Sequence, residues 1–207
     1  ITETGLHGAS GSVGYVAGDF QKGIKFGGIV STQFTICSVT RYAGAHQGRI
    51  LAGQDLNWLH GHYGTRTGVA HYHGWKTGRA TQAPNQEDWV VLCGKNEIGV
   101  GAVMMMQAAG FTDLTAHAST ATWGGTRVCV NCAGEQSDWG ILELITWDRH
   151  LTAAEMEAAA TYLQERLDGG NLGDEQTAVL VEDHQLSAPV HMEAGEARYF
   201  EVLHANS

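Results

Sequence analysis

The sequence predicts an all-β fold: a two-sheet antiparallel jelly-roll sandwich with one C-terminal helix, followed by a partial second β module. The chain of 207 residues contains 28 glycines and only 2 prolines, which indicates many turns. Short apolar segments follow one another at intervals of roughly ten to twenty residues, as is typical of a sandwich. A helical period, with apolar residues three and four apart, occurs once and late in the chain.

The clearest strand is residues 34–42, "FTICSVTRY", which places apolar side chains on both of its alternating faces. A strand that is apolar on both faces lies inside a layered structure. Further strands are predicted at residues 49–53, 68–75, 88–94, 100–106, 126–131 and 139–147.

The stretch "LTAAEMEAAATYLQERLDGG" is predicted to be the helix. Thr152 is a suitable N-cap, and Glu155 three residues later completes a capping box. The apolar stripe consists of Met156, Ala159, Ala160, Leu163 and Leu167. Gly169 and Gly170 supply the C-terminal stop.

Residues 1–170 are assigned to the sandwich, and residues 171–207 to a linker and the start of a second β module. "NLGDEQ" is polar, whereas "TAVLVED" and "ARYFEVLHANS" have strand composition. The chain does not begin with Met, so we expect it to be a piece of a longer or processed protein.

The formal net charge is −10. Binding to nucleic acid requires clustered Lys and Arg, so we expect no nucleic-acid partner. An anionic membrane surface is disfavoured for the same reason. No apolar run approaches the roughly 20 residues that span a bilayer, so we expect no direct membrane insertion.

The stretch from Asn57 to Thr77 concentrates aromatic and imidazole side chains. Aromatic faces beside a few polar groups are typical of a small-ligand site, including one for sugars. The candidate ligand-binding residues are Asn57, Trp58, His60, His62, Tyr63, His71, Tyr72, His73 and Trp75. The alternative is that these residues are ordinary sandwich packing.

The four histidines of this stretch are also candidate metal ligands. His60 and His62 lie two residues apart, as do His71 and His73, so each pair faces one side of a strand. Two such pairs on neighbouring strands could converge on zinc or copper. Glycines in "LHGHYG" could instead make that segment a loop, and the imidazoles could simply be hydrogen-bonded within the sheet.

A polysaccharide hydrolase is the enzymatic alternative, with Glu143 as its first acid. Such an enzyme needs two carboxyl groups, about 5 Å apart when configuration is retained. Glu143 shares its strand face with Ile145 and Trp147, whereas Asp148 faces the other way. Glu135 and Asp138 belong to a loop, and no G-x-S-x-G motif is present. We therefore expect no enzymatic activity.

Cys129 and Cys132 form a C-x-x-C motif. In an extended chain their Cα atoms would lie about 10 Å apart, too far for a disulfide, whereas a turn would bring them closer. The three full pairings of four cysteines remain open on sequence alone.

Several segments carry a family pattern: "FTICSVTRY", "GRILAG", "NWLHGHYG", "GVAHYHGWKT", "DWVVLCGKN" and "SDWGILELITWDRHLTAAEMEAAATYL". Together they resemble the concanavalin A-like lectin/glucanase superfamily in its laminin-G-like form. The variant with NWLHGH and HYxGWKT is similar to domains in large surface proteins of unicellular algae and related protists. The segment "APVHMEAGEARYFEVLHANS" resembles part of a PA14-type module.

The resemblance implies several further features. It places Cys37 and Cys93 in one sheet, where they would form a disulfide or remain buried thiols. Laminin-G-like domains often hold one calcium ion at the sandwich rim, for which the loop acids Asp55, Asp113 and above all Asp138 are candidates. Apart from that ion we expect no cofactor.

We therefore expect a non-catalytic module of an extracellular or cell-surface protein that serves glycan binding, adhesion or structural assembly. A filament, flagellar hair or envelope layer is one such assembly. Its partners would be glycans or neighbouring modules. The alternatives are the hydrolase and a histidine-rich metal-binding module, because the superfamily supports several functions.

Overall fold

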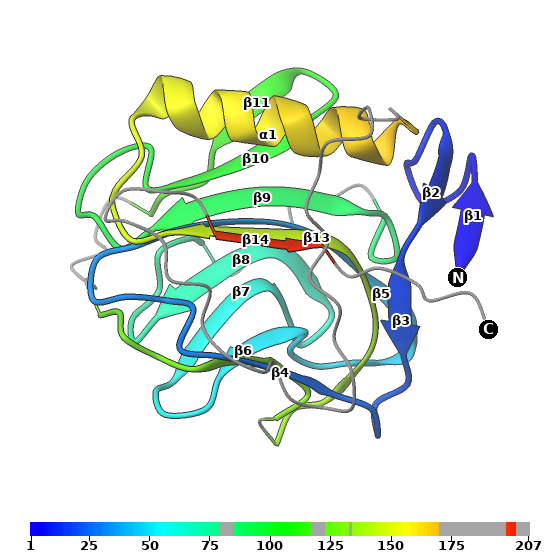
Figure 1. Cartoon of the computed structure of the whole chain (residues 1–207), viewed down its shortest axis with the longest axis horizontal. Helices are drawn as coiled ribbons and strands as arrows, with labels where there is room; N and C mark the ends of the chain where they lie inside the picture. Colours follow the sequence, from blue (N-terminus) through cyan, green and yellow to red (C-terminus); the bar gives the residue numbers. More distant parts are fainter. Residues whose placement is uncertain (79–84, 117–122, 133, 170–197, 202–207) are drawn as a thin grey trace.

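The protein is an all-β sandwich, in agreement with the prediction from its sequence. The computed structural model describes residues 1–78, 85–116, 123–132, 134–169 and 198–201. Two antiparallel sheets pack face to face, and one helix covers the outer face of the larger sheet (Figure 1). This arrangement gives three layers: helix, large sheet and small sheet.

The large sheet has seven strands in the order β11-β10-β9-β5-β13-β14, with β3 also paired to β13. Their bounds are Gly110–Asp113 (β11), Val103–Gln107 (β10), Val90–Lys95 (β9), Thr35–Gln47 (β5), Ser137–Trp147 (β13), Arg198–Glu201 (β14) and Val16–Gly18 (β3).

The small sheet has five strands in the order β4-β12-β6-β7-β8. Their bounds are Ile24–Gly27 (β4), Val128–Val130 (β12), Leu51–Gly53 (β6), Trp58–Tyr63 (β7) and Arg66–Tyr72 (β8). Beside the sandwich, β1 (Thr2–Thr4) and β2 (Ser12–Gly14) form a separate hairpin.

Strand β5 lies inside the layered structure, as its apolar pattern on both faces predicts. Ile36 and Tyr42 point into the core between the sheets. Cys37 and Val39 point the other way and join the core between the large sheet and the helix. One strand therefore contributes to both cores, because side chains alternate across a strand.

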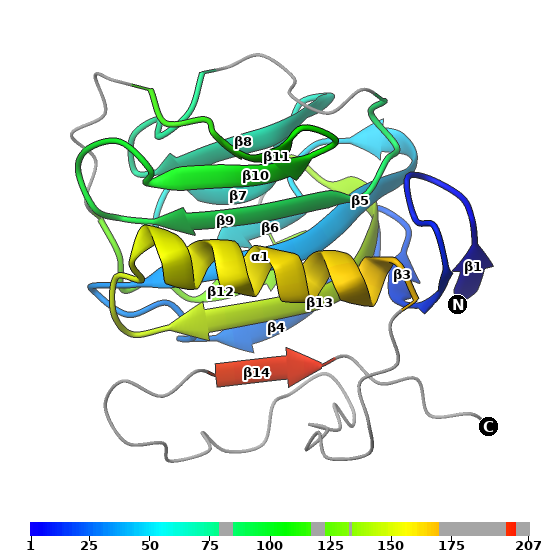
Figure 2. The ribbon, with the colours of Figure 1, turned by 90° about the horizontal axis from the view of Figure 1, so that it is seen from above.

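Helix α1 (Ala153–Leu167) has the predicted N-terminus. The capping box is present: the Thr152 side chain accepts from the Glu155 backbone N–H, and the Glu155 carboxylate accepts from the Thr152 N–H. The buried stripe of the helix is Met156, Ala160, Leu163 and Leu167, with Ala159 partly buried. The helix lies lengthwise across the large sheet, over β5 and β9 (Figure 2). Gly169 follows it with φ of 82°.

Some strand bounds differ from the predicted ones. The strand expected at 68–75 begins at Arg66 and ends at Tyr72, because His73 has a left-handed φ of 58° that turns the chain. The strand expected at 100–106 begins at Val103.

The expected second module falls mostly outside the described residues, since residues 170–197 and 202–207 are not among them. Within this part, β14 pairs with β13 in antiparallel register, Leu144 opposite Phe200. The assignment of residues 171–207 to a second module stays a prediction.

The cysteines form two disulfides. Cys37 and Cys93 lie directly opposite each other on β5 and β9, with Cα atoms 4.0 Å apart, so they share one sheet as expected and form a disulfide, one of the two states left open by the sequence. Cys129 and Cys132 are also paired, with Cα atoms 5.9 Å apart. The extended geometry considered for this motif is not found, because Asn131 has a φ of 55° and turns the chain between the two cysteines.

Candidate functional site

The stretch from Asn57 to Thr77 forms the β7–β8 hairpin and a short return segment along the β8 edge of the small sheet. A two-residue turn, Gly64–Thr65, joins the strands, and both residues have positive φ, 54° and 68°. That is the type I′ geometry, whose twist matches the two strands. Beyond Tyr72 the chain doubles back, so that Trp75 bridges to His71.

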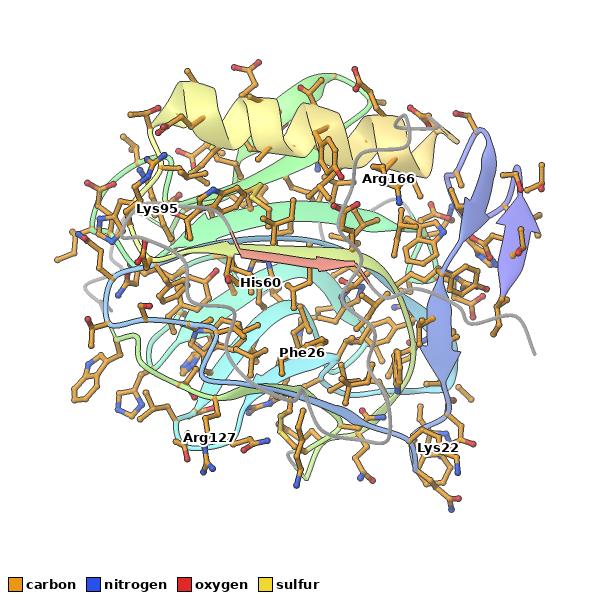
Figure 3. The ribbon with its side chains drawn as sticks, in the orientation of Figure 1. Lys22, Phe26, His60, Lys95, Arg127 and Arg166 are labelled. Carbon is orange, nitrogen blue, oxygen red and sulfur yellow. A yellow bond between two sulfur atoms is a disulfide. The ribbon has the colours of Figure 1, made fainter. Side chains whose placement is uncertain are left out.

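One face of the hairpin lies in the core between the sheets. Trp58, His60, His62 and Tyr72 are all fully buried there. Figure 3 shows His60 between the two sheets. The Trp58 and Tyr72 rings stack with centroids 5.4 Å apart, so these two aromatic residues are core packing.

His60 is held in one tautomer by its partners. Its Nε2 lies 3.3 Å from the carbonyl oxygen of Leu92, which can only accept, so Nε2 carries the proton. Its Nδ1 therefore accepts from the Tyr72 hydroxyl at 2.8 Å. Burial lowers the pKa of His60 to about 4, against a weaker opposing effect of the hydrogen bond to Leu92.

His62 lies beside His60 and faces β5. Its Nδ1 is 3.3 Å from the Thr40 hydroxyl, and its ring meets the Tyr42 ring edge-on at 4.6 Å. Burial, and then the charge of His60 when protonated, lower the pKa of His62 to about 3. Both histidines are therefore neutral at physiological pH.

The remaining candidates lie on the other face of the hairpin and beside it. Asn57 and His73 are exposed, while Tyr63, His71 and Trp75 are half-buried. The Trp75 ring contacts the Tyr63 ring at 5.8 Å and the His71 ring at 5.1 Å. This group, Asn57, Tyr63, His71, His73 and Trp75, is the outer aromatic patch.

The backbone carbonyl of Asn57 holds the two outer histidines in place. The Nδ1 of His71 donates to it at 2.8 Å, and the backbone N–H of His73 donates to it at 3.1 Å. His73 in turn contacts Trp123, whose ring is 4.7 Å away and 55% exposed. Sequence reasoning did not select Trp123, because its position beside His73 follows from the fold and not from any local pattern.

Two arginines, also not selected from the sequence, border the patch. The guanidinium carbons of Arg49 and Arg66 lie 5.3 Å and 5.9 Å from the Tyr63 ring centroid, within cation–π range. Arg49 also donates to the Asn57 side-chain oxygen at 2.9 Å and lies 2.6 Å from the Glu135 carboxylate. The type I′ turn would have identified Arg66, because it sets that residue opposite Tyr63.

Lys76 follows Trp75 but points inward and is fully buried. Its Nζ donates to the backbone oxygen of Glu97 at 2.6 Å. Burial lowers the pKa of Lys76 to about 8, against the raising effect of the nearby Glu97 charge. Inward Lys76 and outward Trp75 show that the return segment alternates like a strand.

The four histidines do not come together. His60 and His62 lie between the sheets, whereas His71 and His73 lie on the outer face of the small sheet. Across the described parts of the chain, no group of three or more His, Cys, Asp or Glu side chains could hold a metal ion.

The three rim acids considered for calcium lie apart, and each accepts from N–H or O–H groups. Asp55 binds Arg127 through both oxygens, and Asp113 accepts from the backbone N–H groups of Gly101 and Thr115. Asp138 accepts from Phe20 and His46. Although burial raises the pKa of Asp138, these hydrogen bonds outweigh it and lower the pKa overall.

Glu143, the candidate catalytic acid, lies beneath the helix. Its side chain is 1% exposed, and its oxygens accept from the Tyr162 hydroxyl at 2.8 Å and from Arg166 Nε at 3.2 Å. Arg166 lies between the helix and the sheet (Figure 3). Glu143 therefore links helix α1 to the large sheet.

No helix among the described residues is long and apolar enough to cross a membrane. In comparisons with known proteins, no family model and no curated protein sequence match the chain.

Proposed function

We propose that this chain is a non-catalytic, concanavalin A-like module of an extracellular or cell-surface protein, and that it binds glycan through the outer aromatic patch. The observation that carries the proposal is the pair of half-buried rings, Tyr63 on β7 and Trp75 on the return segment, whose centroids lie 5.8 Å apart. Exposed ring faces beside a few fixed polar groups are what a sugar ring needs from a protein surface.

The surroundings of the two rings favour sugar binding over simple packing. His71 and Asn57 are both anchored by hydrogen bonds, so their side chains are ordered before a ligand arrives. Preorganised groups lose little conformational entropy on binding, and the cost of association is lower. The fold behind the patch is fixed by the buried Trp58–Tyr72 stack.

The two disulfides support an extracellular setting. Disulfides form and persist in oxidising compartments and are uncommon in cytosolic proteins. The position of Glu143 supports a non-catalytic module, because both of its oxygens are engaged by Tyr162 and Arg166 under the helix.

The proposal is tested with a glycan array and then titration calorimetry on the best ligand. We expect Tyr63→Ala and Trp75→Ala each to weaken binding about tenfold, equivalent to about 1.4 kcal/mol. Phe20→Ala is the matched control, because Phe20 is a partly buried surface ring that stacks on His46 instead.

Unchanged affinity of both patch variants would move the binding site elsewhere on the module. Silence of the wild-type protein on the whole array, together with self-association in solution, would favour assembly with neighbouring modules over glycan binding.

A further inference from the structure

Arg66 differs from the other arginines of the protein. Every other arginine whose side chain is described forms an ion pair with a carboxylate, as the pairs Arg41–Glu3, Arg49–Glu135, Arg127–Asp55, Arg149–Glu155 and Arg166–Glu143 show. Among the described residues, no carboxylate lies within ion-pair distance of Arg66. This is notable in a chain with 22 acidic and 12 basic residues.

The hairpin turn fixes the position of Arg66. Arg66 is the cross-strand partner of Tyr63 on the other side of the Gly64–Thr65 turn. Side chains of directly opposite residues lie on the same face of a sheet, so Arg66 lies on the face that carries the outer aromatic patch. The turn itself is anchored, because Gly64 and Thr65 donate their N–H groups to the carbonyls of Gly48 and Gln47.

We propose that the outer aromatic patch selects anionic glycans, with Arg66 binding a carboxylate or sulfate group while Tyr63 and Trp75 contact the sugar ring. This inference rests on the proposed function and names its ligand class. The guanidinium is planar and presents two parallel N–H groups, which match the oxygens of a carboxylate or a sulfate ester.

The neighbouring arginine cannot take the same role as readily. Arg49 is bound to Asn57 and lies against Glu135, so its charge is largely compensated. Its part is to hold the Asn57 side chain and the Tyr63 ring in position. Arg66 supplies the uncompensated charge at the patch.

Because the chain as a whole is negatively charged, binding of an anionic glycan depends on the positive charge of Arg66. At a net charge of −10 the protein repels a polyanion at long range. Salt screens charges that lie more than a Debye length apart, about 10 Å at 0.1 M salt. An anionic glycan therefore needs a cation on the protein close to its own negative charge. Arg66 beside two sugar-stacking rings meets that requirement.

The test compares matched polysaccharides by affinity electrophoresis and calorimetry. The probes are polygalacturonate and its fully methyl-esterified form, and a sulfated galactan and the same galactan after desulfation. We expect the wild-type protein to bind one of the two anionic polymers about tenfold more tightly than its neutral counterpart, and to lose this preference as salt rises. The polymer that shows the preference distinguishes carboxylate from sulfate recognition.

Three substitutions separate a direct contact from a general charge effect. Arg66→Gln is expected to weaken binding of the anionic polymer about tenfold and leave the neutral one unchanged. Arg66→Lys should restore part of the loss, since it keeps the charge without the planar fork. Arg127→Gln removes the same charge from an exposed arginine paired with Asp55, and should have no effect. Thermal unfolding checks that each variant folds.

Equal binding of anionic and neutral polymers would overturn this inference while leaving glycan binding intact. Equal losses for Arg66→Gln and Arg127→Gln would also overturn it, because the effect would then be one of net charge. Binding of none of the polymers would overturn it together with the proposed function.

Discussion

Acidification between about pH 7.5 and pH 5 is expected to destabilise the fold through His60 and His62. Both are fully buried and neutral in the folded protein, with pKa values lowered from 6.5 to about 4 and about 3. In the unfolded chain both regain the ordinary value and take up protons below it. The stability that depends on these histidines is therefore fully present above about pH 7.5 and falls as the pH decreases through 6.5 toward the folded-state values.

The expected loss follows from the difference in proton binding. At about pH 5 an unfolded histidine is almost fully protonated, while the two folded ones remain neutral. Each then lowers the free energy of unfolding by about 2 kcal/mol, and the two together by about 4 kcal/mol. A domain of ordinary stability has about 5–15 kcal/mol, so the loss is large.

Carboxylates add little in this pH window. The pKa values of Asp138 and Glu155 are lowered by the hydrogen bonds that they accept, so they lose their contribution only as the pH falls further, through those lowered values. Above about pH 5, the change in stability with pH is therefore expected to come from the histidines. Urea denaturation at a series of pH values measures the free energy of unfolding.

The test variant is the double substitution His60→Gln and His62→Gln, which keeps polar side chains but removes the titration. We expect it to be less stable than wild type at neutral pH, yet to lose about 4 kcal/mol less on acidification. His73→Gln, at an exposed histidine, is the control. Its free energy of unfolding should change with pH as steeply as that of the wild type. A double variant with that same slope would refute the assignment of the acid sensitivity to the buried pair.

Two further predictions concern the backbone. Thr65 is β-branched and has a φ of 68°, which is strained for such a residue. Thr65→Gly should relieve this strain and raise the free energy of unfolding, measured by urea denaturation, by about 1 kcal/mol. A loss of stability would show that the threonine is not strained there. A Cβ on Gly94 would clash with the Tyr72 hydroxyl. Gly94→Ala should therefore lower the free energy of unfolding by about 1–3 kcal/mol and disturb the Tyr72–His60 hydrogen bond. An unchanged melting temperature would contradict this close approach.

The strand at 34–42 and the capped helix could be predicted because their signals are local. Apolar residues on both faces of "FTICSVTRY" correctly indicate a middle layer, and Thr152 with Glu155 marks the helix start. A local signal of this kind needs no knowledge of what the element packs against.

The face of the sheet on which each histidine lies could not be predicted, because it depends on strand register. The hairpin pairs Trp58 with Tyr72 and His60 with Ala70. His71 therefore pairs with Leu59 and faces outward. A shift of one residue would have placed the two histidine pairs on one face, and the register is set by the two-residue turn.

Arg66 shows the same dependence on the turn. In the sequence it is one of several scattered basic residues, three positions after Tyr63. Only the type I′ turn makes it the direct partner of that tyrosine. The sequence "GT" is not the Asn-Gly pair that usually marks such a turn, so the hairpin had no strong local signal.

Glycan binding at the outer face of the β7–β8 hairpin requires the folded core on its inner face. Acid can therefore weaken binding through a histidine on either face. His71 lies on the binding face, and burial lowers its pKa despite a hydrogen bond to Asn57. A loss of binding in acid could therefore come from protonation of His71 or from unfolding driven by His60 and His62. The double glutamine variant separates the two causes, because it removes the second and leaves the binding face unchanged. Binding that survives to lower pH in that variant would assign the loss to the core, whereas an unchanged profile in a folded variant would assign it to His71.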